Sequence, residues 1–69
     1  MLLRTKVGLS RDVVHETLKV DGVRVSHSVM GNYDVILYAE AKSIEDLRRI
    51  RIAVEKISGI TITETLVHA

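Results

Sequence analysis

The clearest pattern along the chain is an alternation of apolar and polar positions over residues 35–41, which is typical of a β-strand. Residues 31–34 precede it and have the composition of a turn. The β-branched, serine-rich stretch 23–30 predicts another strand on the other side of that turn. Residues 2–8 and 60–67 predict two further strands, so the sequence predicts four in all.

Two segments between these strands have the spacing of amphipathic helices. In the first, Ser10 is the predicted N-cap and Asp21-Gly22 the stop. In the second, Ser43 is the predicted N-cap and Ser58-Gly59 the stop. The residues expected on the buried faces are Val13, Val14, Thr17 and Leu18 in the first helix, and Ile44, Leu47, Ile50, Val54 and Ile57 in the second.

The order strand-helix-strand-strand-helix-strand predicts an α+β, ferredoxin-like βαββαβ fold. Right-handed crossovers place both helices on one face of a four-stranded antiparallel sheet. With 69 residues, the chain is expected to be a single domain over 1–69.

The sheet face away from the helices is predicted to be apolar. Along residues 35–41 one side carries Val35 and Leu37, yet the other still carries Ile36 and Tyr38. In the last strand Ile60, Ile62 and Leu66 are expected on one side and mainly threonines on the other. A solvated face would be more polar, so we expect copies to pack through it, gaining roughly 1.5–3 kcal/mol per buried side chain before association costs. A monomer with scattered exposed apolar residues is the alternative.

Composition narrows the possible partners. The chain has no cysteine, 46% hydrophobic residues and a net charge of +1 from ten basic and nine acidic residues. Disulfides are therefore excluded, and a domain this small has a thin core, which favours an oligomer. Mixed charges argue against direct binding of nucleic acid or membrane. Arg4 and Lys6 interrupt the apolar start, so no signal peptide is expected and the location is expected to be cytoplasmic. Ile52, on the far side of the second helix, is a weak sign of a contact beyond a dimer.

No catalytic residue, metal site or cofactor is predicted. The chain has no nucleophile elbow, phosphate loop or dinucleotide fingerprint, and His15, His27 and His68 lack zinc-ligand spacing. His27 could act as a base, but between two serines on a strand it more often lies at an interface. The arginine cluster 48–51 has acidic neighbours along the helix and indicates a salt-bridged face rather than a phosphate site.

Two segments are candidates for a ligand site. A hairpin turn explains Gly31 and Asn32 but does not require Tyr33 and Asp34. Asp34 could pair with a ligand ammonium while turn N–H groups receive a carboxylate, a combination suited to an amino acid. The second segment, 61–65, would set three threonine hydroxyls on one strand face, although threonine is common in strands anyway.

The two segments resemble motifs of the effector-binding domain of the Lrp/AsnC transcription regulators. Residues 29–35 are similar to the family's valine-threonine-glycine-x-tyrosine-aspartate, with Met30 in place of the usual threonine. Residues 59–67 are similar to its closing glycine-valine-x-x-threonine-x-threonine strand. The match covers nearly the whole chain. These regulators carry a helix-turn-helix domain before this one, so the chain resembles the stand-alone members.

The resemblance implies a ferredoxin-like fold, dimers packed sheet on sheet, octamers or decamers of such dimers, and amino-acid effectors bound between dimers. It implies a sensor or modulator of transcription regulation without its own DNA-binding domain, and a full-length Lrp/AsnC regulator is a candidate partner. A ligand-free scaffold subunit and a small dimeric α+β barrel-type enzyme remain alternatives. Carried over by position, the ligand-binding residues are Gly31, Asn32, Tyr33 and Asp34 on one wall and Thr61, Thr63 and Thr65 on another.

Overall fold

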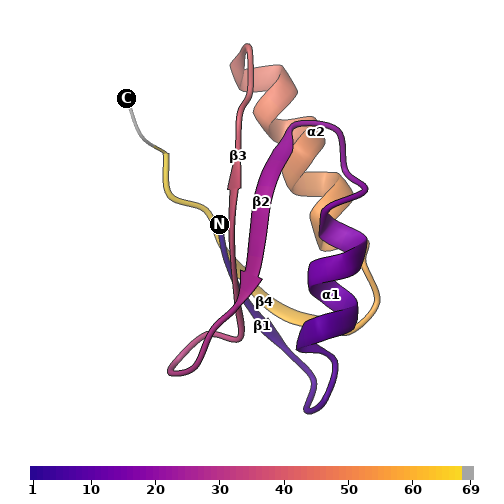
Figure 1. Ribbon diagram of the computed structural model, residues 1–69. Coiled ribbons are helices and arrows are strands. Elements are labelled where there is room, and N and C mark those ends of the chain that lie inside the picture. Colours follow the sequence, from indigo (N-terminus) through magenta and orange to yellow (C-terminus); the bar gives the residue numbers. More distant parts are fainter. Residues whose placement is uncertain (68–69) are drawn as a thin grey trace.

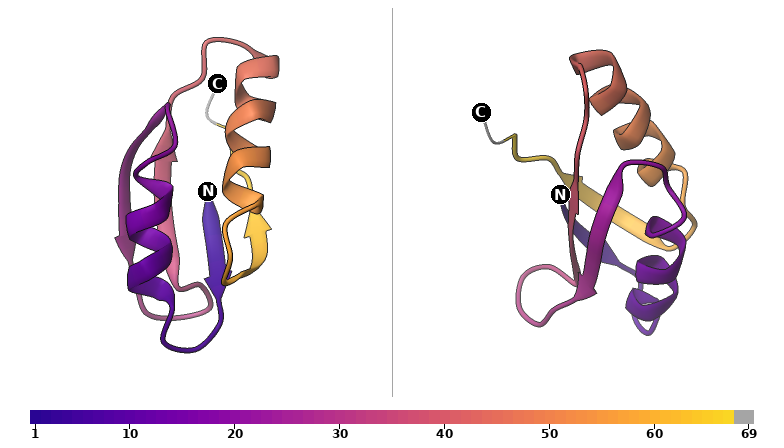
Figure 2. Two further views of the ribbon diagram at one scale, coloured as in Figure 1. Left: turned by 90° about the vertical axis from the view of Figure 1, so that its right-hand side faces the viewer. Right: turned by 45° about the horizontal axis from the view of Figure 1, so that its top comes forward.

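Four strands form one antiparallel sheet in the computed structural model, which describes residues 1–67 (Figure 1). Both helices cover one face of the sheet and leave the other face open (Figure 2). The strand order is β2-β3-β1-β4, so the predicted ferredoxin-like α+β fold is confirmed. The elements are β1 (Leu2–Thr5), α1 (Ser10–Thr17), β2 (Val23–Ser28), β3 (Val35–Ala39), α2 (Ile44–Glu55) and β4 (Ile60–Glu64).

The strands are shorter than the sequence predicts. β3 ends at Ala39 rather than residue 41, and β4 ends at Glu64 rather than residue 67. β1 lies between these two strands and begins only at Leu2, so both neighbours extend beyond its pairing. A ladder needs a partner strand, and the outer ends of β3 and β4 therefore leave the regular sheet. β2 ends at Ser28 rather than residue 30, because the chain then leaves the ladder for the loop to β3.

The two helices begin differently. At α2 the predicted N-cap is confirmed, since the Ser43 hydroxyl accepts a hydrogen bond from the Asp46 N–H at 3.1 Å. At α1 the predicted N-cap is wrong. Ser10 is already helical, and Leu9 precedes it without a side-chain cap bond. A turn at Gly8, with φ of 82°, brings the Leu9 N–H to the Lys6 carbonyl oxygen and starts the helix one residue early. No helix within residues 1–67 has the length and apolar character to cross a membrane.

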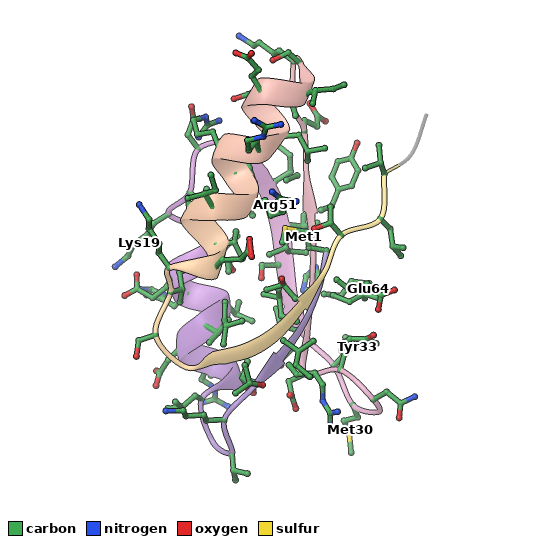
Figure 3. All side chains as sticks on the ribbon, turned by 180° about the vertical axis from the view of Figure 1, so that it is seen from behind. Met1, Lys19, Met30, Tyr33, Arg51 and Glu64 are labelled. Carbon is green, nitrogen blue, oxygen red and sulfur yellow. The ribbon has the colours of Figure 1, made fainter. Side chains whose placement is uncertain are left out.

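The first residue of the chain is paired with β3. The Met1 nitrogen donates to the Leu37 carbonyl oxygen at 2.7 Å, and the Leu37 N–H donates to the Met1 carbonyl oxygen at 2.9 Å. Figure 3 labels Met1 near the middle of the molecule, beside the sheet. The β1–β3 pairing thus extends one residue beyond Leu2 and stops there.

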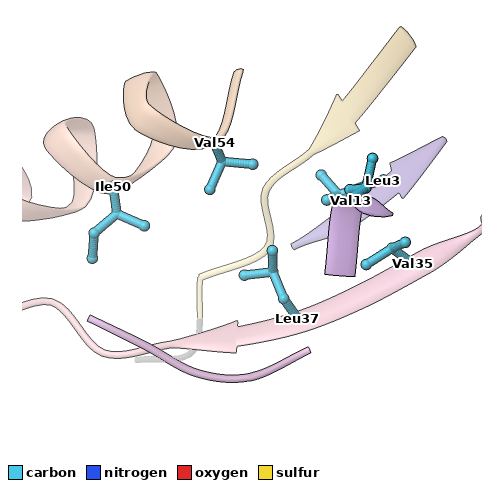
Figure 4. Packing of buried hydrophobic residues seen from close by; sticks show 6 residues of the cluster. All are labelled: Leu3, Val13, Val35, Leu37, Ile50 and Val54. Atoms are coloured by element: carbon cyan, nitrogen blue, oxygen red, sulfur yellow. The ribbon is translucent and has the colours of Figure 1, made fainter. Parts of the chain in front are cut away.

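The core lies between the sheet and the helices. It consists of six side chains that are at most 3% exposed, namely Leu3, Val13, Val35, Leu37, Ile50 and Val54 (Figure 4). Two residues predicted to be buried are instead exposed, Leu18 and Ile44. Ile44 is the first residue of α2 and Leu18 follows the last residue of α1. Both therefore lie at helix ends, outside the central turns that contribute the buried helix residues.

A bulge in β4 alters the predicted faces of that strand. Thr5 pairs with Ile60 and Arg4 pairs with Ile62, so Thr61 is an extra residue with no partner on β1. Directly opposite residues share a face of the sheet. Ile60 therefore packs toward the core, whereas Ile62 lies with Arg4 on the open face. The expectation that Ile60 and Ile62 share one side is wrong, because it assumed unbroken alternation.

The open face is apolar, as the alternation of β3 predicts. Ile36 pairs with Leu2 and His27, and Tyr38 pairs with Val25, so these side chains share the face away from the helices. Its large hydrophobic members are 42–55% exposed. We use "outward face" for the apolar residues on this side of the sheet: Leu2, Val25, Ile36, Tyr38 and Ile62.

Candidate ligand-binding site

The predicted turn at residues 31–34 is confirmed as a loop between β2 and β3. It projects past the open side of the sheet (Figure 1). The Val29 N–H donates to the Asp34 carbonyl oxygen at 2.8 Å, which closes the loop. Gly31 has a φ of 128° and no neighbour near its Cβ position, so the backbone conformation rather than space requires glycine there.

Asp34 has an internal partner that the sequence did not predict. Its Oδ2 accepts a hydrogen bond from the Thr5 N–H at 2.8 Å, and its own N–H donates to the Leu3 carbonyl oxygen at 2.9 Å. Thr5 is the residue at which the β1–β4 register shifts. Asp34 therefore satisfies a backbone donor beside the bulge, and a ligand ammonium would have to approach its other oxygen.

Tyr33 links the loop to the far edge of the sheet. Its hydroxyl donates to the Glu64 carboxylate on β4, and both residues are labelled in Figure 3. This hydrogen bond raises the pKa of Tyr33; partial desolvation and the Glu64 charge add to the rise, while Arg4 opposes it. Glu64 was not predicted as a site residue. No local pattern could have found it, because its partner is 31 residues away.

The structure does not bring the three threonines into one wall. Thr61 lies in the bulge, and its hydroxyl donates to the Arg4 carbonyl oxygen at 3.2 Å. Thr63 pairs with Leu3 and therefore faces the helices. Thr65 lies beyond the end of β4. The predicted row of hydroxyls on one strand face is wrong, since the bulge and the early strand end break the alternation.

A groove of about 890 Å³ lies at the other end of β1 from the 31–34 loop. The end of β3, the first turns of α2 and residues 65–67 form its walls. Of the predicted ligand-binding residues, Thr65 lines this groove and those of the 31–34 loop do not. One chain therefore holds two separate candidate regions, the loop with its Glu64 contact and the groove. Lining residues of the groove include Met1, Ala39, Ile44, Leu47, Thr65 and Leu66.

The histidines and arginines lie apart from both regions or in ion pairs. His27 is on the open face opposite Ile36, His15 is exposed on α1, and His68 lies outside the described residues. Among residues 1–67, no three His, Cys, Asp or Glu side chains gather as metal ligands would. In the arginine cluster, Arg49 pairs with Asp46 at 2.7 Å and Arg51 pairs with Glu55 at 3.6 Å, as the predicted salt-bridged face requires.

Two solved structures share this architecture. FFRP-DM1 superposes with a TM-score of 0.89 and 29% sequence identity, over 99% of this chain and 92% of that chain. The hypothetical protein PHS023 from Pyrococcus horikoshii superposes with a TM-score of 0.86 and 30% identity, over 94% and 80%. No family model and no curated protein matches the sequence. FFRP-DM1 is a feast/famine regulatory protein of the Lrp-like kind, so the chain has an Lrp-like effector-binding fold.

Proposed function

We propose that the chain is an oligomeric, non-catalytic module that binds a small effector, as the resemblance to Lrp-like regulators implies. The observation that carries the proposal is the outward face. Its large hydrophobic side chains are 42–55% exposed on a sheet whose other face is covered by helices. Apolar patches of this kind mark surfaces that pack against a partner.

A second copy is the partner that we propose for this face. In a two-fold dimer each patch packs on its own copy, so every apolar side chain contributes twice. Eight half-exposed side chains at about 1 kcal/mol each are of the same order as the association cost of about 4–15 kcal/mol. Residues 29–34 and 65–67 both extend past the open side of the sheet, where they would add contacts (Figure 1).

We further propose an amino acid as the effector, bound in crevices that form between copies. Within one chain the loop containing Asp34 and the groove containing Thr65 are separate. An assembly of dimers, octameric or decameric, would set the loop of one copy near surfaces of another. A full-length Lrp/AsnC regulator is a further candidate partner, through the same face.

Sedimentation and native mass spectrometry of matched variants test the assembly. Ile36 and Ile52 are 42% and 43% exposed, but Ile36 is on the outward face and Ile52 is on α2. We expect Ile36→Glu to give monomers, because it buries a charge in the dimer contact. Ile52→Glu should retain dimers and lose only larger assemblies. A wild-type chain that sediments as a folded monomer at micromolar concentration would contradict the proposal.

A ligand-free scaffold subunit is the second candidate, and one observation favours it. The Tyr33 hydroxyl and Asp34 Oδ2, two polar groups of the predicted site, already have partners within the chain. Calorimetry and thermal shift with each standard amino acid separate the two candidates. A sensor gives heat and a stabilising shift with at least one of them, whereas a scaffold gives neither.

A further inference from the structure

The inference concerns the groove at the start of β1, where the middle of the sheet has a gap. Met1 is the last residue that pairs with β3 on this side, opposite Leu37. β3 continues past it to Ala39, and residues 65–67 continue past the end of β4. The groove of about 890 Å³ lies between these two continuing segments. Its position is in line with β1, between the neighbours that β1 has lower in the sheet.

The backbone of β3 is directed into this groove. Both backbone polar groups of Leu37 are bonded to Met1, on the β1 side. Alternate residues of an antiparallel strand direct their N–H and C=O groups to the same side, so those of Ala39 also point to the β1 side. The Glu40 N–H points the other way, to the Gly22 carbonyl oxygen at 2.8 Å. Within residues 1–67, no residue of β1 lies opposite Ala39.

The side chains around this open edge are apolar. Ile44, Leu66 and Val67 stand at the rim, where they are 67–77% exposed, and Leu47 and Ile50 also line the groove. A ligand that fits must hydrogen-bond to a strand edge and also cover aliphatic side chains. An extended peptide does both, because its backbone pairs with the edge while alternate side chains contact the walls. The volume lies within the range of about 300–1,000 Å³ that is typical of ligand pockets, larger than one amino acid needs.

We propose that this groove binds a short, extended, apolar peptide as an added strand, antiparallel to β3 and in line with β1. Roughly three residues span the edge, at about 3.4 Å of rise per residue. The residue opposite Ala39 exchanges both backbone hydrogen bonds with it. This site is distinct from the proposed amino-acid site and needs no second copy of the chain.

Amide hydrogen exchange on the full, untagged chain tests the proposal. The probe is a tetrapeptide of alternating valine and threonine, acetylated and amidated at its ends. At saturation, exchange of the Ala39 amide should slow at least about tenfold, the effect of one added hydrogen bond. N-methylation of the peptide residue opposite Ala39 should weaken binding about tenfold as well. Unchanged Ala39 exchange, or equal binding of the N-methylated peptide, would overturn strand addition.

Variants of the chain separate this site from general stickiness. Leu66→Ser removes apolar contact at the rim and should weaken peptide binding about fivefold. Val7→Ser, at a fully exposed position away from the groove, should leave it unchanged. Equal effects of the two substitutions would contradict the proposed position.

A third variant fills the groove from the chain itself. Adding Val-Thr-Val before Met1 should occupy the edge, protect Ala39 without peptide and abolish binding. The monomeric Ile36→Glu variant should bind peptide as the parent chain does, so failure of the proposed oligomer leaves this result intact. Loss of peptide binding in Ile36→Glu would overturn the inference.

Discussion

Tyr33 and Glu64 join two ends of the sequence across the sheet. The pKa of Tyr33 is raised above its ordinary value of 10.0, mainly because its hydroxyl donates to the Glu64 carboxylate. A phenol with a raised pKa in the folded state stabilises the fold below the pKa of the unfolded chain. That contribution is lost as the pH rises through the folded pKa. The loop should therefore loosen from β4 only in strongly alkaline solution.

Near-ultraviolet absorbance titration checks this expectation. In a Tyr38→Phe background, Tyr33 should ionise above its ordinary value, and Glu64→Gln should move the transition back down by removing the negative charge. An ionisation of Tyr33 at or below pH 10.0 in the background variant would show that the bond to Glu64 does not persist in solution.

Thr17 and Ser26 form a buried polar contact between α1 and β2. Their hydroxyls are 2.8 Å apart and hydrogen-bonded, and both side chains are nearly inaccessible. Thr17→Val should destabilise the fold by about 1–3 kcal/mol, because Ser26 is left without its partner. The double variant with Ser26→Ala should be less destabilised than the sum of the single variants. Urea denaturation measures all three, and strict additivity would show that the two hydroxyls do not interact.

At the scale of the elements, the two helix starts allow a matched comparison. Ser43→Ala removes a hydroxyl that caps α2 and should reduce the free energy of unfolding by about 1 kcal/mol. Ser10→Ala should change it little, because Ser10 is inside α1 and caps nothing. Thermal denaturation compares them. Equal losses in the two variants would contradict the different roles assigned to these serines.

The order of elements was predictable from sequence because local patterns determine it. The alternation in β3 and the Ser43 cap of α2 each depend on residues a few positions apart. The bulge at Thr61 was not predictable, because it arises from the pairing of β4 with β1, more than fifty residues away in sequence. Only strict alternation could be assumed, and it placed Ile62 on the wrong side.

The same division applies to the candidate site. The turn containing Gly31 follows from local composition. The partners of Asp34 and Tyr33, which are Thr5 and Glu64, depend on long-range register. The groove was missed entirely, since it is formed by the offset between strand ends rather than by a motif.

For the whole molecule, charge balance leads to a prediction about DNA. The net charge is +1, and two arginines of the basic cluster are held in ion pairs on α2. Affinity for DNA depends mainly on cations placed against phosphates. We therefore expect no sequence-selective complex in gel-shift assays, even at low salt. A tight, selective shift by this chain alone would contradict that expectation.

The outer strands of the sheet also determine how copies meet in concentrated solution. β4 is rich in β-branched residues, a composition that favours cross-β stacking when a straight strand is exposed. Both outer strands are interrupted, β4 at Thr61 and β2 between Val23 and Val25. Such irregularities bend an edge and prevent another strand from aligning along it. Crowding should therefore produce discrete particles joined through the broad flat side of the sheet, rather than fibrils that grow from its borders.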